Sequence, residues 1–322
     1  MRLLLDTEQR AFADSLDAML TAADTPSVVR EWSRGAPARG RALWSRVAGA
    51  GVFALAVPPA HTGVGPLPVE LAVAFVELGR HAVPGPLAET VAAAALLAEL
   101  ADPGPAGRLL PALVSGEASA TVALDGAYAP DGDTAAVRLA LTAGELRLAP
   151  GHGPVRGCLD PARRLTPLTA GGELLCCAPP VELAVTWARL ATAAQALGVG
   201  LALLDRTVAH VRRRTQFGVP VGSFQAVKHR LADARTALDF ARPLLFGAAL
   251  TMAPADVAAA KVTACEAAYA TARTALQLHG AIGYTAEYDL SLWLTRARVL
   301  RTAWGGPAAC RTAVLEGRAA RR

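Results

Sequence analysis

The sequence predicts a mainly α-helical protein in which a small β domain separates an N-terminal helical domain from a C-terminal four-helix bundle. Apolar residues recur at helical spacing towards both ends of the 322-residue chain. Short alternating segments divided by Gly, Asp and Pro lie between them, a pattern typical of strands and turns. Hydrophobic residues make up 53% of the chain and aromatic residues only 5%, so alanine and leucine must fill a closely packed helical core. We therefore predict domains at residues 1–117, 118–180 and 181–322.

Helix signals recur through the N-terminal domain. Asp6 is expected to cap the first helix, because Gln9 follows it three positions later in a capping-box pattern. Pro68 and Pro86 each stand where a further helix is expected to begin. The Asp-Pro-Gly-Pro cluster at 102–105 is expected to end the last of these helices.

The C-terminal domain shows four helical patterns joined by short loops, which favours an antiparallel bundle. Ser223 is expected to be the N-cap of the second helix and Gly280 the C-terminal cap of the third. The expected helices are Val181–Arg213, a helix following Ser223, Pro254–His279 and the segment 288–304.

Charge and cysteine content exclude several classes of protein. The formal net charge is +5, and arginines cluster at 212–214 and 296–322. No zinc-finger or RNP motif accompanies them, so we expect no nucleic-acid partner; a phosphate-bearing cofactor or a CoA thioester fits the charge as well. The five cysteines have no CxxC spacing, and we expect reduced thiols and no metal site.

The apolar segments are interrupted before they reach the length of a membrane span. The apolar part of the N-terminal MRLLLDTEQR is too short for a signal peptide. We therefore expect a cytoplasmic protein without a membrane span.

The stretch RRRTQFGVPVGSFQAVKHRLADA at 212–234 stands out from the alanine-rich helices around it. It combines three arginines, a Gln-Phe-Gly turn and a Ser-Phe-Gln helix start. Such charge-assisted and amide donors suit an anionic group such as a pyrophosphate. The alternative is structural: Arg214 as a surface charge, Phe217 as core and Gln225 as a helix cap.

Three segments together resemble the acyl-CoA dehydrogenase family: LWSRVAGAGVFALAVPPAHTGVG at 43–65, the stretch 212–234, and QLHGAIGYTAEY at 277–288. The resemblance implies an FAD cofactor. It implies that residues of the segment 212–234 reach across a subunit interface into a neighbour's flavin site. It also implies that residues of the segment 277–288 contact the adenine-diphosphate part of FAD. The residues that it assigns to cofactor binding are Arg214, Gln216, Phe217, Gln225, Gln277, Gly280 and Ala281.

The family's catalytic base has no counterpart at the two positions where the family carries it. In the family, a carboxylate removes the α-proton of an acyl-CoA while the flavin accepts a hydride from the β-carbon. By register these positions are Gly305 and Ala188, so we assign no catalytic residue. The predicted β domain is also about half the family's length, and we assign no residue to the flavin ring.

Several functions remain open on this basis. The first is an acyl-CoA dehydrogenase subunit whose homologous partner supplies the catalytic glutamate for oxidation of a fatty or steroid acyl-CoA. The others are an FAD- or acyl-CoA-binding scaffold, and a homo-oligomeric flavoenzyme, dimer or tetramer, with an unrecognised base. An electron-transfer flavoprotein is a further partner that the resemblance implies. Asp205 and His210 are expected on a helix surface, and His279 in packing at a helix end.

Overall fold

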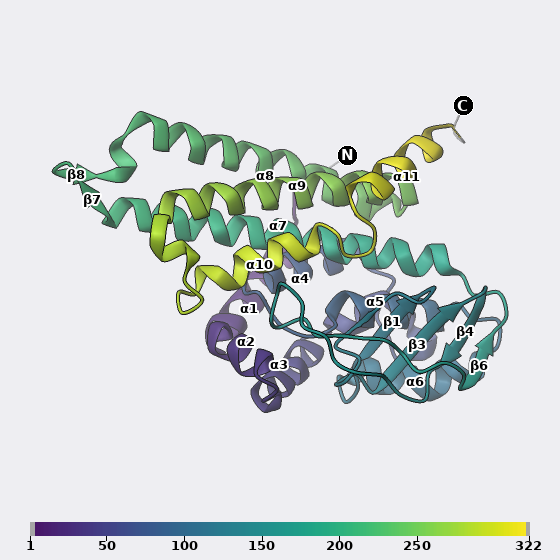
Figure 1. Cartoon of the computed structure of the whole chain (residues 1–322). Coiled ribbons are helices and arrows are strands. Elements are labelled where there is room, and N and C mark those ends of the chain that lie inside the picture. The colour runs from purple at the N-terminus through teal and green to yellow at the C-terminus, as the bar shows by residue number, and fades with distance from the viewer. Residues whose placement is uncertain (1–3, 320–322) are drawn as a thin grey trace. The chain divides into compact units, whose positions relative to one another are not determined.

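A computed structural model of the chain describes residues 4–319 and confirms the mainly helical fold (Figure 1). The ends of the first and last predicted domains, 1–3 and 320–322, lie outside the described residues. The first helices are α1 (Thr7–Thr21), α2 (Thr25–Ser33), α3 (Ala38–Gly49), α4 (Pro68–Arg80), α5 (Leu87–Ala98) and α6 (Pro103–Ser115). The later ones are α7 (Val181–Arg213), α8 (Gln225–Thr251), α9 (Pro254–His279), α10 (Leu290–Leu300) and α11 (Pro307–Ala319).

The chain forms two compact units, each built from separate segments. One comprises residues 1–26, 72–83 and 192–322, and the other residues 27–71 and 84–191. The strands up to 176 lie in the second unit. They are β1 (Ala120–Leu124), β2 (Ala129–Pro130), β3 (Val137–Thr142), β4 (Glu145–Leu148), β5 (Leu165–Thr166) and β6 (Glu173–Cys176).

A four-stranded sheet in the order β1-β3-β4-β6 forms the β part of the second unit. β1 and β3 are parallel, and the other neighbours are antiparallel. The buried Thr90 hydroxyl of α5 donates to the Ala120 carbonyl at 3.1 Å and accepts from the Ala120 amide at 3.0 Å. This reciprocal pair holds α5 against the first residue of the sheet.

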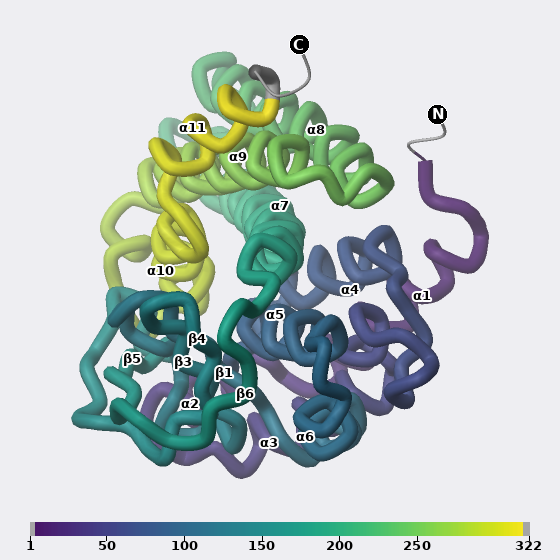
Figure 2. Tube along the Cα trace, turned by 90° about the vertical axis from the view of Figure 1, so that its right-hand side faces the viewer, coloured from purple at the N-terminus to yellow at the C-terminus, as the bar shows by residue number. Residues whose placement is uncertain are grey.

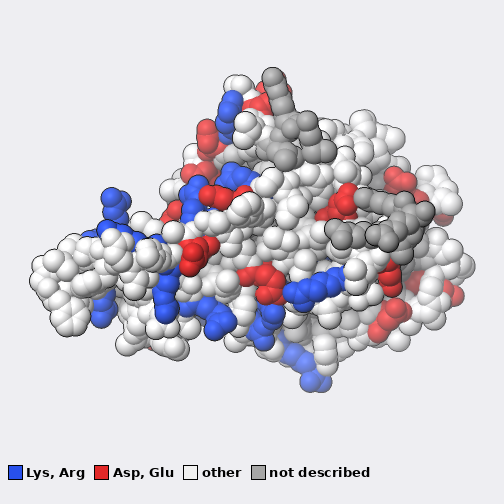
Figure 3. Space-filling view, turned by 90° about the horizontal axis from the view of Figure 1, so that it is seen from above, with Lys and Arg blue, Asp and Glu red and all other residues white. Residues whose placement is uncertain are grey.

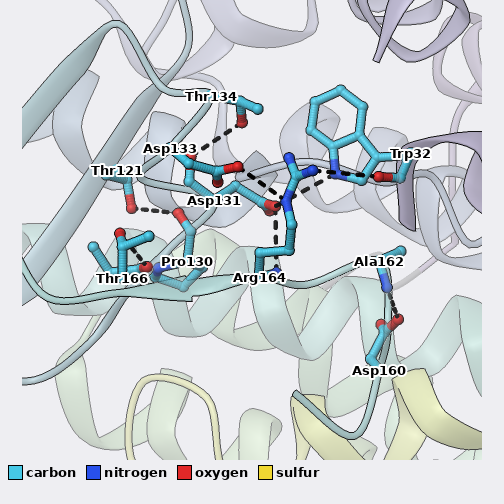
Figure 4. A network of polar contacts seen from close by, with 11 residues as sticks. Trp32, Thr121, Pro130, Asp131, Asp133, Thr134, Asp160, Ala162, Arg164 and Thr166 are labelled. Atoms are coloured by element: carbon cyan, nitrogen blue, oxygen red, sulfur yellow. Dashed lines mark hydrogen bonds and ion pairs between the residues drawn. The ribbon is translucent and has the colours of Figure 1, made fainter. Parts of the chain in front are cut away.

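A buried ionic network lies beside this sheet (Figure 4). Arg164 Nε lies 3.2 Å from Asp133 Oδ2 and 3.8 Å from Asp131 Oδ1, and its guanidinium faces the Trp32 ring. Trp32 Nε1 donates to Asp131 Oδ1 at 3.4 Å. Burial raises the pKa of Asp131 to about 7, although Arg163 and Arg164 oppose that shift. The network links α2 to the β2–β5 pairing and serves the packing of this unit.

Helices α7 to α11 make up most of the first unit. α9 packs against α8, α10 and α11, and α8, α9 and α11 lie together in Figure 2. α4 approaches α7 closely: a Cβ added to Gly198 would lie 1.9 Å from the Val76 carbonyl oxygen. The end of α4 is tied to α10, because Trp293 Nε1 donates to the Arg80 carbonyl and Arg296 Nη1 to the Val83 carbonyl.

α7 is long and apolar enough to cross a membrane by length and composition alone, which the sequence patterns did not suggest. However, 94% of its most apolar window is buried inside the protein. Burial of this extent is what the central helix of a packed bundle shows.

Three local expectations need correction. The 102–105 cluster begins a helix rather than ending one, because Asp102 accepts from the Gly104 amide and Pro103 occupies the first turn. Ser223 is not an N-cap: its hydroxyl donates to the Pro220 carbonyl, and α8 begins at Gln225 after Phe224, which makes no side-chain cap. The helix expected at 288–304 is shorter, since α10 spans Leu290–Leu300 and residues 301–304 form a turn that leads to α11. By contrast, the Asp6 capping box and the bounds of α7 and α9 are confirmed.

Candidate functional site

The chain leaves α7 through a short projecting hairpin formed by β7 (Thr215–Gln216) and β8 (Val219–Pro220) (Figure 1). Phe217 and Gly218 form its turn with φ values of 54° and 79°, the positive angles that tight hairpin turns require. For Phe217 such a backbone conformation is strained. Its side chain is nevertheless 92% exposed, so packing within this chain does not compensate the strain.

Three predicted cofactor-binding residues meet at one surface pocket of about 380 Å³. Arg214 enters it from the end of α7, and Gln277 and Gly280 from the end of α9. Gly280 has φ 64° and ψ −141°, a conformation that side chains disfavour, so a glycine is required where the backbone borders the pocket. The complete lining is Arg214, Val221, Ala226, Val227, Arg230, Gln277, Leu278, His279 and Gly280.

Four predicted residues lie outside this lining. Gln216 and Phe217 lie on the hairpin, where Gln216 Nε2 donates to the Thr215 carbonyl. Gln225 is the first, exposed residue of α8, and Ala281 is exposed in the 3₁₀ turn after α9. The Phe217 ring contacts the Phe224 ring edge-on at 6.3 Å. Within one chain, the structure therefore does not bring these four side chains to the pocket.

The pocket is suited to an anion. Two arginines and an amide side chain lie in its lining, and no acidic residue belongs to the described lining. Figure 3 shows Lys and Arg side chains gathered near the projecting tip. Guanidinium groups and amides are the donors that bind phosphates well. Arg230 was not assigned from the sequence; its position in the 212–234 segment, five residues after Gln225, was the available signal.

One imidazole of the pocket lining, that of His279, is stacked on a second imidazole, that of His210. The rings of His210 and His279 are 4.1 Å apart at an angle of 27°, and His279 Nδ1 lies 2.8 Å from the Ala275 carbonyl oxygen. His210 was expected on a helix surface, but its Nε2 is buried, as is that of His279, and neither has a hydrogen-bond partner among the described residues. Burial lowers the pKa of both imidazoles, and for His210 the nearby His279 and Arg214 lower it further.

The first predicted base position, Gly305, lies in a tight turn between α10 and α11. Trp304 has φ 55° and Gly305 φ 106°. The fully buried Lys261 of α9 donates from Nζ to the Gly305 carbonyl oxygen at 2.7 Å. Lys261 was not predicted from the sequence. The signal that could have revealed it is a single charged residue within an alanine-rich face of a helix. The other position, Ala188, is completely buried in α7.

Two family models match the chain. The model described as acyl-CoA dehydrogenase, N-terminal domain, matches residues 6–117, and the one described as acyl-CoA dehydrogenase, C-terminal domain, matches residues 181–318. Acyl-CoA dehydrogenase IpdE2 of Mycobacterium tuberculosis is 37% identical over 249 residues, which are 77% of this chain and 77% of that protein.

Solved structures share the fold. The ChsE4-ChsE5 complex from Mycobacterium tuberculosis contains a chain with 26% identity and a TM-score of 0.84, covering 99% of both chains. A variant of the Tcur3481-Tcur3483 steroid acyl-CoA dehydrogenase has 26% identity and a TM-score of 0.84, covering 97% of this chain and 98% of that one. A glutaryl-CoA dehydrogenase of Mycobacterium smegmatis, solved with FADH2, has a TM-score of 0.86 at 17% identity, covering 99% and 96%.

Proposed function

Because the chain belongs to the acyl-CoA dehydrogenase family, we propose that it is an FAD-binding subunit that works with a homologous, base-carrying partner. The observation that carries the proposal is the division of the predicted cofactor residues. Arg214, Gln277 and Gly280 line a pocket, while the Phe217 ring points away from its own fold on a projecting hairpin.

The residues present fit the diphosphate arm of FAD. Arg214 and Arg230 would bind the pyrophosphate, Gln277 would donate its amide, and the backbone at Gly280 would allow close approach. When bound, FAD supplies the acceptor for the hydride that leaves the β-carbon of an acyl-CoA. Gln216, Phe217, Gln225 and Ala281 would meet cofactor only in an assembly, where the hairpin can contact a second subunit.

The proposed partner supplies the proton-removing group. At Gly305 the chain has no side chain, and at Ala188 it has a buried methyl group, so neither position can take the α-proton of a thioester. Two of the similar structures are named as two-component assemblies, one of them a steroid acyl-CoA dehydrogenase. The proposal is therefore a heteromeric enzyme acting on a fatty or steroid acyl-CoA, with electrons passed to an electron-transfer flavoprotein. A cytoplasmic location belongs to the same proposal, since the apolar window of α7 is buried.

Production with and without a homologous partner tests the proposal. We expect flavin and dehydrogenase activity in the co-purified complex, and neither in this chain alone. Yellow, active protein obtained from this chain alone would instead indicate a homo-oligomer with another base. A complex that binds flavin without turnover with any acyl-CoA would indicate a scaffold.

Replacement of Arg214 tests the pocket within that complex. Arg214→Ala removes a charge-assisted contact worth about 1.5–3 kcal/mol, so we expect the dissociation constant for flavin to rise roughly ten- to hundred-fold and flavin to be lost already at correspondingly higher protein concentration. Arg311→Ala, an exposed arginine of α11, is the matched control and should retain flavin. Equal flavin retention by both variants, measured by absorbance after gel filtration, would exclude this role for Arg214.

A further inference from the structure

The stacked His210 and His279 rings have no place in the function described so far. His279 is completely buried at the end of α9 and lines the pocket, and the ring of His210 in α7 covers it. The Tyr288 ring lies against His279 at 5.6 Å. Because the Ala275 carbonyl can only accept, His279 Nδ1 carries a proton, and in the neutral ring Nε2 has a free lone pair.

The charged groups that face the pair are mostly cationic. α7 contributes Arg213 and Arg214, both of which disfavour protonation of His210. α8 contributes Arg230 to the same pocket, and the segment before α10 contributes the phenol of Tyr288. Burial adds to this repulsion, and the pKa of each imidazole is lowered, so both rings are neutral near pH 7 in the free protein.

We infer that the His210–His279 pair is a proton-accepting part of the diphosphate site: an anion bound beside Arg214 draws one proton onto the pair, and the protonated imidazole strengthens the binding of that anion. This inference rests on the proposed function, because it takes the pocket to bind a diphosphate.

The physical reason is the change of charge at Arg214. A diphosphate beside this guanidinium reverses the local field, so a proton on the pair is attracted where it was repelled before. The second proton stays excluded, since two imidazolium rings would lie 4.1 Å apart. By linkage, a ligand that promotes proton uptake must itself bind more tightly as the pH falls.

The probe that we choose is ADP-ribose, in which each of the two phosphates carries one ester and one anhydride linkage and has no group that titrates near neutral pH. Calorimetry with the flavin-free full-length chain at about pH 8 and about pH 6 gives the affinities. The titration is repeated at one pH in two buffers that differ in ionisation enthalpy. The difference between the two binding enthalpies gives the number of protons taken up. We expect binding to tighten roughly three- to tenfold towards the lower pH, with uptake of up to about half a proton, because a pKa rise of about one unit corresponds to at most a factor of ten in affinity.

His279→Phe keeps an aromatic ring in the stack and removes one of the two imidazoles that can accept the proton. We expect it to bind ADP-ribose with an affinity that depends much less on pH. His229→Phe, on the exposed start of α8, is the matched control and should keep the pH dependence of the unchanged chain. His210→Phe provides a second test if His279→Phe does not fold, as judged by circular dichroism.

The outcomes separate this inference from the proposed function. No binding of ADP-ribose by the unchanged chain, at either pH, would overturn this inference, whereas the proposed function, which expects flavin only in the complex, would stand. A second outcome is binding that is abolished by Arg214→Ala but is independent of pH and takes up no proton. This outcome would overturn the proton coupling and leave the proposed function standing. Weaker binding at the lower pH would overturn the coupling as well.

Discussion

At the scale of single residues, Gly305, which we propose to stand at the family's base position, is part of a local structure that favours glycine. Its φ of 106° lies where residues with a side chain are strained, and its carbonyl accepts the only hydrogen bond that the structure shows for the Lys261 ammonium among the described residues. The backbone conformation at the position where we propose that the base is absent therefore favours glycine.

Gly305→Glu tests this interpretation. We expect the free energy of unfolding to fall by about 1–3 kcal/mol, and the isolated chain to gain no dehydrogenase activity, because the new side chain forces the turn out of its conformation. Gly306→Ala is the control: φ at Gly306 is not positive and an added Cβ meets nothing within 4 Å. Chemical denaturation and an acyl-CoA oxidation assay measure the two effects. A stable, active Gly305→Glu chain would show that only the carboxylate was missing.

At the scale of elements, the regular helical patterns were predictable and the proline-rich boundaries were not. Val181–Arg213 and Pro254–His279 begin and end where the periodicity does. The 102–105 cluster is typical of the end of a helix because it contains two prolines and a glycine. In the structure, Pro103 and Pro105 lie in the first turn of α6, where a missing amide costs nothing, and Asp102 caps it.

The contact between α4 and α7 carries an element-scale prediction. Gly198→Ala would place a Cβ 1.9 Å from the Val76 carbonyl oxygen, so the two helices must separate. We expect a loss of about 2–3 kcal/mol in the free energy of unfolding. Gly247→Ala in α8 is the matched control, because its Cβ meets nothing within 4 Å, and it should stabilise the chain by about 0.5–1 kcal/mol. A thermal melt in which both variants shift in the same direction would contradict the close contact.

At the scale of the whole molecule, the acidic group of Glu77 should make stability depend on pH. Burial raises its pKa from 4.5 to about 7, with Asp17 adding to the rise and Arg80 opposing it. Over this window the folded chain binds more protons than the unfolded chain, so the free energy of unfolding falls as the pH rises from about 4.5 to about 7.

Glu77→Gln removes that titration. Relative to the unchanged chain, we expect the variant to become more stable by up to about 3 kcal/mol as the pH rises through the window, and to show no such trend outside it. Urea denaturation at several pH values measures the difference, with the exposed Glu316→Gln as control. A difference that stays constant with pH would mean that the pKa of Glu77 is the same in the folded and in the unfolded chain.

The candidate site was only partly accessible to sequence reasoning, and the reason is structural. Motif spacing pointed to Arg214, Gln277 and Gly280, which the fold brings to one pocket. It could not reveal Arg230 or the His210–His279 stack, since these depend on which faces of α7, α8 and α9 meet. The assignments of Gln216, Phe217, Gln225 and Ala281 stay predictions, because one chain alone does not supply the surroundings in which they would act.

The hairpin tip also has a consequence for how a cell must produce this protein. Phe217, Val219 and Phe224 at and beside this tip are all exposed, and grouped apolar side chains of this kind favour association with a neighbouring molecule for as long as they are uncovered. A chain made in excess of its partner would thus be prone to aggregation and degradation. In the assembly proposed above, we therefore expect this chain to accumulate best when its partner is made in at least equal amount.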